Sequence, residues 1–204
     1  MRLPARSAFL AVALLAASMA GARAETGDVV IQAGHQGRPA SCAPLHVRAC
    51  NLGTSGANGA LERDWTPIVA DAAARILRAQ GYAVIRRPAD YAEHDSARAA
   101  VFLHFDGAEP CASGASVGFP PSARSEFVSE WERRYRAWFP YRFVGENISD
   151  NESQYYGFRK VDAPDKMLIE FGEMTCPAQF AWMAPRLHEM GERLAAFLIH
   201  ELPR

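Results

Sequence analysis

Three short apolar runs, separated by longer amphipathic stretches, constrain the fold of this chain more than any other feature. The runs cover residues 28–33, 101–105 and 167–171, and each is apolar nearly throughout. Such runs are typical of strands that are buried on both faces of a parallel sheet. Residues 61–80 and the segment after Pro177 carry apolar side chains at helical spacing. The alternation of strands and helices predicts an α/β fold, a three-layer sandwich in which helices cover both faces of a mostly parallel twisted sheet.

The expected helix at residues 61–80 contains one residue that does not suit a helix interior, Pro67. The helix is therefore either kinked in its first turn or begins near Thr66. After it, residues 82–86 read as a short strand, and residues 97–100 as a helical turn that leads into the next buried strand.

Residues 112–163 depart from the strand–helix alternation and form an aromatic-rich insertion. Eleven of the 21 aromatic residues of the chain lie between Phe119 and Phe158. Within the insertion, residues 122–139 have a helical pattern with aromatic side chains on one face. Two interpretations remain open: the insertion packs as a satellite core on one sheet face, or it forms a lid or wall of a substrate groove.

The first 24 residues have the pattern of a signal peptide. Arg2 and Arg6 give a positive start, an apolar stretch covers residues 7–20, and Ala22-Arg23-Ala24 matches the small-x-small cleavage pattern. The apolar stretch is too short for a membrane anchor, and no later segment is long and apolar enough to cross a bilayer. We therefore expect a periplasmic or secreted protein whose mature part, residues 25–204, forms one domain.

The charge of the mature chain argues against polyanionic partners. Three of the 22 basic residues lie in the expected leader, so 19 basic residues face 23 acidic ones, a net charge of −4 with histidine neutral. This mildly acidic balance disfavours nucleic acid and anionic lipid as partners. A monomeric enzyme with a small or glycan-linked substrate fits it better.

The four cysteines suggest two disulfides, as expected for an exported chain. Cys42 and Cys50 lie in one loop, which predicts a bond between them. Cys111 and Cys176 each follow one of the apolar runs closely, so the loops that carry them run side by side if those strands are neighbours. A cysteine-based metal site is the weaker alternative, because the chain has no CxxC spacing.

Four residues at the edges of the expected elements give the strongest functional signal: His35, Glu62, His104 and Glu170. Three of them follow or close the apolar runs, and Glu62 opens the long helix. In open α/β sheets, ligands bind at the carboxyl ends of the strands. Two imidazoles and a carboxylate can hold zinc with one open position, and a second carboxylate can act as base for a metal-activated water. The sequence therefore predicts a zinc hydrolase, with the remaining histidines facing solvent: His46, His94, His188 and His200.

Five short motifs follow one another in a definite order, at residues 29–37 (VVIQAGHQG), 59–65 (GALERDW), 81–87 (GYAVIRR), 102–106 (FLHFD) and 168–172 (LIEFG). They resemble the motifs of zinc-dependent N-acetylmuramoyl-L-alanine amidases of the amidase-3 type. The matching family motifs are a Gly-His-Gly-Gly turn, a Glu-Lys-Asp-Leu helix start, a strand ending in Thr-Arg, Ser-Ile-His-Ala-Asn, and Leu-Val-Glu-x-Gly. The resemblance covers residues 28–201 apart from the insertion.

The resemblance implies a role for each of the four residues. His35, Glu62 and His104 would hold zinc, and Glu170 would be the catalytic acid/base. The chain would then hydrolyse the amide that joins the lactyl group of muramic acid to L-alanine in peptidoglycan. It departs from the family at Gln36, at Phe105-Asp106 and at residues 173–176, which makes it a divergent member with an open substrate identity.

The resemblance also sharpens the second interpretation of the insertion. Some members of the family carry a helix in this region that plugs the site with a glutamate. In this chain, the residues placed to do so are Glu126, Glu130 and Glu132. Simple packing remains the alternative, above all for Trp131 and Trp138.

Two other functions remain as alternatives. One is a different zinc amidohydrolase or carboxypeptidase on a related sheet, but such enzymes commonly carry a short His-x-x-Glu ligand pair, and His35 and Glu62 are 27 residues apart. The other is a glycan-binding or metal-sequestering module without turnover, for which a base such as Glu170 would be unnecessary.

Overall fold

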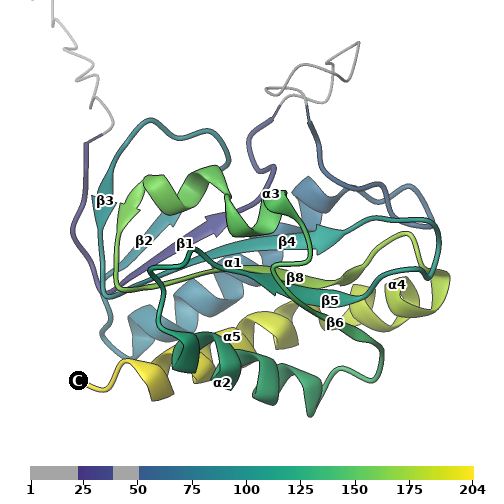
Figure 1. Cartoon of the computed structure of the whole chain (residues 1–204). Coiled ribbons are helices and arrows are strands. Elements are labelled where there is room, and N and C mark those ends of the chain that lie inside the picture. The colour runs from purple at the N-terminus through teal and green to yellow at the C-terminus, as the bar shows by residue number, and fades with distance from the viewer. Residues whose placement is uncertain (1–22, 39–50) are drawn as a thin grey trace, which may run out of the picture.

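A six-stranded sheet forms the centre of the computed structural model, which describes residues 23–38 and 51–204 (Figure 1). In spatial order its strands are β2 (Val84–Arg87), β1 (Val29–Ala33), β4 (Ala99–Asp106), β8 (Asp165–Glu173), β5 (Ala115–Gly118) and β6 (Phe143–Glu146). The first four strands are parallel, β5 is antiparallel to β8, and β6 is parallel to β5. A separate pair joins β3 (Asp95–Ser96) to β7 (Val161–Asp162). The predicted α/β fold with a mostly parallel sheet is confirmed.

The two faces of the sheet carry layers of unequal thickness (Figure 1). One face is covered by the long helices α1 (Glu62–Ala79), α2 (Ser125–Arg136) and α5 (Leu187–Glu201). The other is covered by a thinner layer that includes the short helix α3 (Asp150–Ser153) and the 3-10 helix η2 (Tyr156–Arg159). We call these the helix face and the thin face. The three-layer sandwich is confirmed.

Alternation along the strands decides which residues reach each face. In β1, Val29, Ile31 and Ala33 belong to the large hydrophobic core of the helix face, and Val30 belongs to the small core of the thin face. Successive side chains of a strand point to opposite faces, so Gln32 lies on the thin face beside Val30. The same alternation in β4 and β8 puts His104 with Phe102, and Glu170 with Leu168, on the thin face. The polar residues near the strand ends therefore share one face.

Helix α1 begins at Glu62 and runs without a break through Pro67. The proline removes one backbone hydrogen bond near the start of the helix, where few such bonds are yet formed. Two acidic residues in the first turn, Glu62 and Asp64, suit the positive end of the helix dipole. Gly81, with a φ of 82°, ends the helix in the left-handed conformation that favours glycine.

Two predictions of local structure are wrong. Residues 97–100 do not form a helical turn, because Ala99 and Ala100 already belong to β4 and pair with β1 on one side and β8 on the other. The helix after Pro177 is also interrupted. It is divided into α4 (Pro177–Met183), a 3-10 turn (Ala184–Arg186) and α5, because Pro185 cannot continue the helix as one α-helix.

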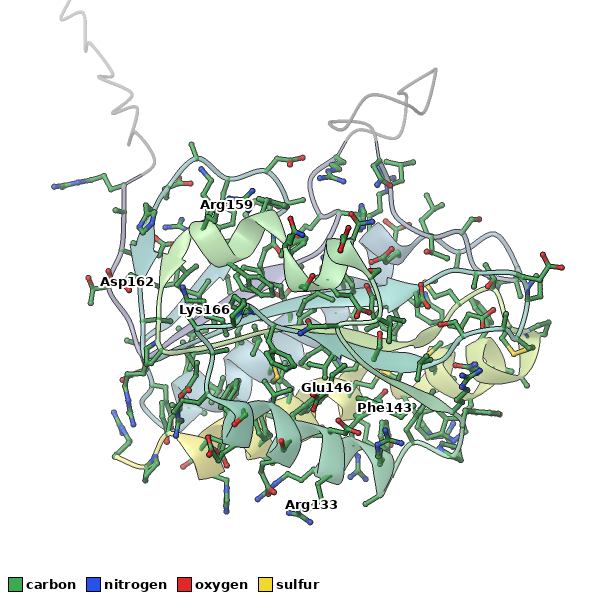
Figure 2. All side chains as sticks on the ribbon, in the orientation of Figure 1. Arg133, Phe143, Glu146, Arg159, Asp162 and Lys166 are labelled. Atoms are coloured by element: carbon green, nitrogen blue, oxygen red, sulfur yellow. A yellow bond between two sulfur atoms is a disulfide. The ribbon has the colours of Figure 1, made fainter. Side chains whose placement is uncertain are left out.

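The region 112–163 supplies two strands of the main sheet and packs α2 against its helix face. Phe127, Trp131 and Tyr135 are almost fully buried in the large core, and Trp138 packs against it. The packing interpretation is therefore confirmed for α2. Figure 2 shows Arg133 of α2 below the sheet and Arg159 of η2 above it, on opposite faces.

The alternative interpretation, in which an α2 glutamate approaches the metal site, is wrong. Glu130 forms ion pairs with Arg133 and Arg134, and Glu132 forms one with Arg136. Glu126 lies on the same helix, in its first turn. These carboxylates are separated from the thin face by the sheet, so α2 is a packing element.

A disulfide joins Cys111 to Cys176 and ties the loop after β4 to the loop after β8. This confirms the second predicted pair. The same loop is held by Glu173, whose carboxylate accepts hydrogen bonds from the backbone N–H groups of Cys111 and Ser113, both at 2.7 Å. The predicted Cys42–Cys50 bond lies outside the described residues and stays a prediction, which peptide mapping of the non-reduced protein tests.

Removing the Cys111–Cys176 bond should destabilise the protein without changing its metal content. The bond closes a loop with a sequence separation of 65, and a cross-link of this length contributes about 2–4 kcal/mol to the free energy of unfolding. We expect the Cys111→Ala/Cys176→Ala variant to lose stability of this order in urea denaturation. Zinc content should stay normal, because the hydrogen bonds of Glu173 keep the loop in place. An unchanged urea midpoint would contradict the expectation.

Candidate metal centre

The sheet topology brings three of the four predicted site residues to neighbouring strand ends. His35 lies in the turn that follows β1, His104 near the end of β4, and Glu170 in β8 at the position that pairs with His104. The chain leaves β1 toward β2 on one side and later returns to β4 on the other side. This is the switch point at which open α/β sheets bind ligands. Glu62 reaches the same place from the first position of α1.

His35, Glu62 and His104 converge on one point. Each offers one ligand atom, and these three atoms lie within 4.8 Å of one another. Nδ1 of His104 is 2.9 Å from Oε1 of Glu62, and Nε2 of His35 is 3.5 Å from Oε2 of Glu62. The two imidazole rings meet edge to face at a centroid distance of 5.1 Å. The structure therefore brings the three predicted ligands together.

The donor set around these residues fits a bound cation. The Glu62 carboxylate is 2% exposed and accepts backbone hydrogen bonds from Thr54 at 2.8 Å and Phe105 at 3.1 Å. The outer nitrogen of His35, Nδ1, lies 2.8 Å from the carbonyl of Asn51, an oxygen that can only accept. Nη1 of Arg38 lies 3.0 Å from the same nitrogen, and Nε2 of the ring faces Glu62. Two imidazoles and one carboxylate that converge in a buried site are a ligand set that suits zinc.

Burial and mutual charge set the protonation of the cluster. Burial lowers the pKa of His35, with Glu62 acting in the opposite direction, so the ring favours the neutral form that ligates metals. Burial alone would raise the pKa of Glu62, but the hydrogen bond and charge of His104, together with His35, outweigh it and lower that pKa. Glu62 is therefore held as a carboxylate.

Glu170 lies beside this cluster, and its pKa is shifted in the opposite direction from that of Glu62. Its Oε2 atom is buried and has no hydrogen-bond partner among the described residues. Burial, followed by the charge of Glu62, raises the pKa of Glu170 well above its usual value. A carboxyl group that takes up protons readily and has a free oxygen can exchange protons with a reacting molecule. Glu173, by contrast, has both carboxylate oxygens occupied by hydrogen bonds.

A cavity of about 660 Å³ opens over the cluster on the thin face. His35, His104 and Glu170 lie in one wall, and residues 148–156 with Arg159 form much of the opposite wall. Figure 1 shows this second segment lying above the strands. The chemical groups of the cluster are therefore accessible to a ligand of substantial size.

Several solved structures share this architecture, and three of them are named as N-acetylmuramoyl-L-alanine amidases. AmiC2, an N-acetylmuramoyl-L-alanine amidase of Nostoc punctiforme, superposes with a TM-score of 0.64 at 21% identity, over 86% of this chain and 97% of that one. The catalytic domain of the amidase CwlV from Bacillus (Paenibacillus) polymyxa gives 0.66 at 16% identity, over 87% and 98%. An amidase from Clostridium difficile 630 gives 0.64 at 17% identity, over 88% and 97%.

This chain has the amidase fold. That confirms the fold which the motif resemblance implied. No protein-family model and no curated protein matches the sequence, so the likeness is carried by the arrangement of the elements.

Sequence reasoning missed several residues that surround the cluster of His35, Glu62 and His104. Arg38 lies in the cavity wall and donates to the Asn51 carbonyl at 2.8 Å. Tyr155 contacts the outer nitrogen of His104, Nε2, at 3.1 Å. One signal was present: Gln32 is a polar residue inside an otherwise apolar strand, and it is fully buried. The exposed histidines were predicted correctly within the described residues: His94, His188 and His200.

Gly34 leaves space for the ring of His104, which leads to a testable prediction. A Cβ atom at this position would overlap the imidazole, so Gly34→Ala should displace a ligand without removing one. We expect zinc affinity to fall at least about tenfold, the lower end of the effect of disturbing groups that orient ligands. Competition with a chromogenic chelator measures the zinc affinity.

Gly59→Ala is the matched control for this variant. Its φ of 85° makes the substitution strained, but no atom lies within 4 Å of the added Cβ. It should cost stability and leave zinc affinity unchanged. Equal zinc affinities of the Gly34 and Gly59 variants would show that the His104 ring does not depend on Gly34.

Proposed function

We propose that this protein is a zinc-dependent N-acetylmuramoyl-L-alanine amidase, which hydrolyses the amide between N-acetylmuramic acid and L-alanine in peptidoglycan. The observation that carries the proposal is the convergence of His35, Glu62 and His104 beside Glu170, at the switch point of an amidase fold. Solved structures with this fold are named for that activity.

In this proposal, His35, Glu62 and His104 hold one zinc ion, and the cavity side of the cluster stays open. When bound, the zinc supplies a Lewis acid that activates water and polarises the scissile carbonyl. The backbone amides of Thr54 and Phe105 fix both oxygens of Glu62. The protein therefore presents a preorganised ligand set.

Glu170 is the proposed acid/base. It is the neighbour of His104 in the parallel pairing of β4 and β8, so its carboxyl group faces the same cavity. It takes a proton from the water that attacks the amide carbonyl and delivers it to the leaving nitrogen of L-alanine. Its unpartnered Oε2 and its raised pKa support this role.

The proposed site of action is the periplasm or the cell exterior. The leader-like pattern of residues 1–24 supports export, and the Cys111–Cys176 disulfide suits an oxidising compartment. None of the helices in the described ranges has the length and apolar character that a membrane crossing requires. The cell wall would be the substrate in that compartment.

Hydrolysis of purified cell wall, followed by mass spectrometry of the soluble products, tests the proposal. We expect release of stem peptides with a free amino terminus on L-alanine, and loss of this release after zinc removal. Cleavage within the peptide would instead indicate a different zinc peptidase. Binding to the wall without release, unchanged by Glu170→Gln, would indicate a non-catalytic module.

A further inference from the structure

The outer nitrogen of His104 is held by a tyrosine from the segment that covers the thin face. Tyr155 precedes η2, and its hydroxyl lies 3.1 Å from Nε2 of His104. The two residues are 51 positions apart in the sequence. The Tyr155 ring also packs edge to face against Phe102 and against the imidazole itself, both at a centroid distance of 5.3 Å. The contact is therefore part of a packed interface.

A chain of hydrogen bonds determines which of the two groups, the Tyr155 hydroxyl or the His104 ring nitrogen, is the donor in this contact. The backbone N–H of Asp90 donates to the hydroxyl oxygen of Tyr156 at 3.2 Å. The amide nitrogen of Gln32 donates to that oxygen at 2.6 Å, which turns the amide oxygen of Gln32 toward Tyr155. Tyr155 donates its only hydroxyl proton to this oxygen at 2.8 Å. The Tyr155 oxygen is then left to accept, so Nε2 of His104 must be the donor.

The direction matters because the other nitrogen of His104 faces Glu62. With Nε2 bound to Tyr155, Nδ1 is the nitrogen left to ligate a metal, and it lies within hydrogen-bond distance of the Glu62 carboxylate, at 2.9 Å. A ligating histidine commonly donates its second ring nitrogen to a fixed acceptor, which sets both its tautomer and its ring orientation. Tyr155 provides that acceptor here.

The same chain of hydrogen bonds extends to the second histidine. The carboxylate of Asp90 accepts two hydrogen bonds from Arg38, at 2.7 Å and 3.1 Å. Arg38 donates to the Asn51 carbonyl, and Nδ1 of His35 lies 2.8 Å from that carbonyl and 3.0 Å from Nη1 of Arg38. The outer nitrogens of the two histidines are thus connected through one continuous set of hydrogen-bonded groups, which includes the exposed residues Asp90 and Asn51.

We propose that Tyr155, oriented by Gln32, is a positioning residue that fixes His104 for metal binding. The inference rests on the proposed zinc centre and goes beyond it, because it makes the segment that covers the cavity a part of the metal site. Loss of the hydrogen bond between Tyr155 and His104 should then weaken metal binding, although no metal ligand is changed.

Tyr155→Phe tests the inference because it removes one oxygen atom and keeps the packed ring. We expect the zinc dissociation constant, measured by chelator competition, to rise about 10- to 100-fold. In NMR spectra of the metal-free protein, the Nε2-bound proton of His104 should be visible in the wild type and should exchange faster with water in the variant. Gln32→Met, which removes the acceptor of Tyr155, should act in the same direction, and the double variant should be no worse than the stronger single one.

Tyr135→Phe is the matched control. It also removes a buried tyrosine hydrogen bond, to the Phe171 carbonyl at 2.7 Å, but on the helix face. It should reduce stability without changing zinc affinity or the His104 signal. If Tyr155→Phe binds zinc as the wild type does and keeps the His104 proton protected, the inference fails while the zinc centre stands. If the wild type binds no zinc, the proposed function fails, and the NMR signal of the metal-free protein still decides whether Tyr155 fixes His104.

Discussion

Replacement of His35 or His104 by alanine is expected to abolish stoichiometric zinc binding. Each imidazole is one of only three ligand groups in the cluster, and two remaining ligands cannot hold the ion against dialysis. Elemental analysis of the purified variants measures the effect. The control is His188→Ala, which removes an exposed histidine of α5 and should keep a full complement of metal.

The two histidine variants should differ in stability when metal-free. His104 is 7% exposed and lies closer to the buried Glu62 carboxylate than His35 does. Its removal takes away a side-chain partner of that carboxylate, at a cost of about 1–3 kcal/mol. We expect His104→Ala to unfold at a lower urea concentration than His35→Ala. Full zinc content in both variants would place the metal elsewhere.

Glu170→Gln should separate catalysis from binding. Glutamine keeps the shape of the side chain but cannot take a proton, so turnover should fall at least about a hundredfold, the usual scale of general acid/base catalysis. Zinc content should stay normal because Glu170 is outside the three-residue cluster. Release of peptides from cell wall and elemental analysis, measured on the same preparation, test both halves.

The stability of this variant provides a further check. Burial and the neighbouring Glu62 oppose a charge on Glu170, so a neutral amide should leave the metal-free protein at least as stable as the wild type.

Glu152→Gln is the control that shows how much turnover changes when another carboxylate of the cavity wall is replaced. Glu152 lines the same cavity but is bound by Ser116 and the backbone of Ile148, and its replacement should change the rate far less. A normal rate in Glu170→Gln would move the base to another carboxylate of the cavity.

The sequence singled out the candidate site residues because each stands in or beside an apolar run, or at the start of a helical pattern. Strands that are buried on both faces are apolar nearly throughout, so His104 and Glu170 stood out as the polar residues within their runs, and His35 as the histidine that follows the first run. The parallel order of the strands then brought these ends together. Glu62 was visible for a similar reason, at the start of the clearest helical pattern.

The parts that sequence reasoning missed depend on three-dimensional pairing. Ala99 and Ala100 have no strong strand preference, and they are strand residues because β1 and β8 flank them. The aromatic pattern of residues 122–139 predicted a helix but could not say which face of the sheet it would cover. The Tyr155 contact joins residues 51 positions apart, and no local pattern encodes such a pair.

The unequal layers on the two faces of the sheet have a consequence for how this protein can change over evolutionary time. Most of the large buried side chains lie on the helix face, whereas the cavity is walled by the thin layer. Substitutions at exposed positions of the cavity wall, such as Asn151 and Gln154, can therefore diversify substrate preference while the folding core stays intact. Tyr155 limits this freedom, because a new wall must still offer His104 an acceptor. A wall grafted from another protein of this fold would need a hydroxyl or carbonyl at that point, or it would weaken the proposed metal binding as well as change the specificity.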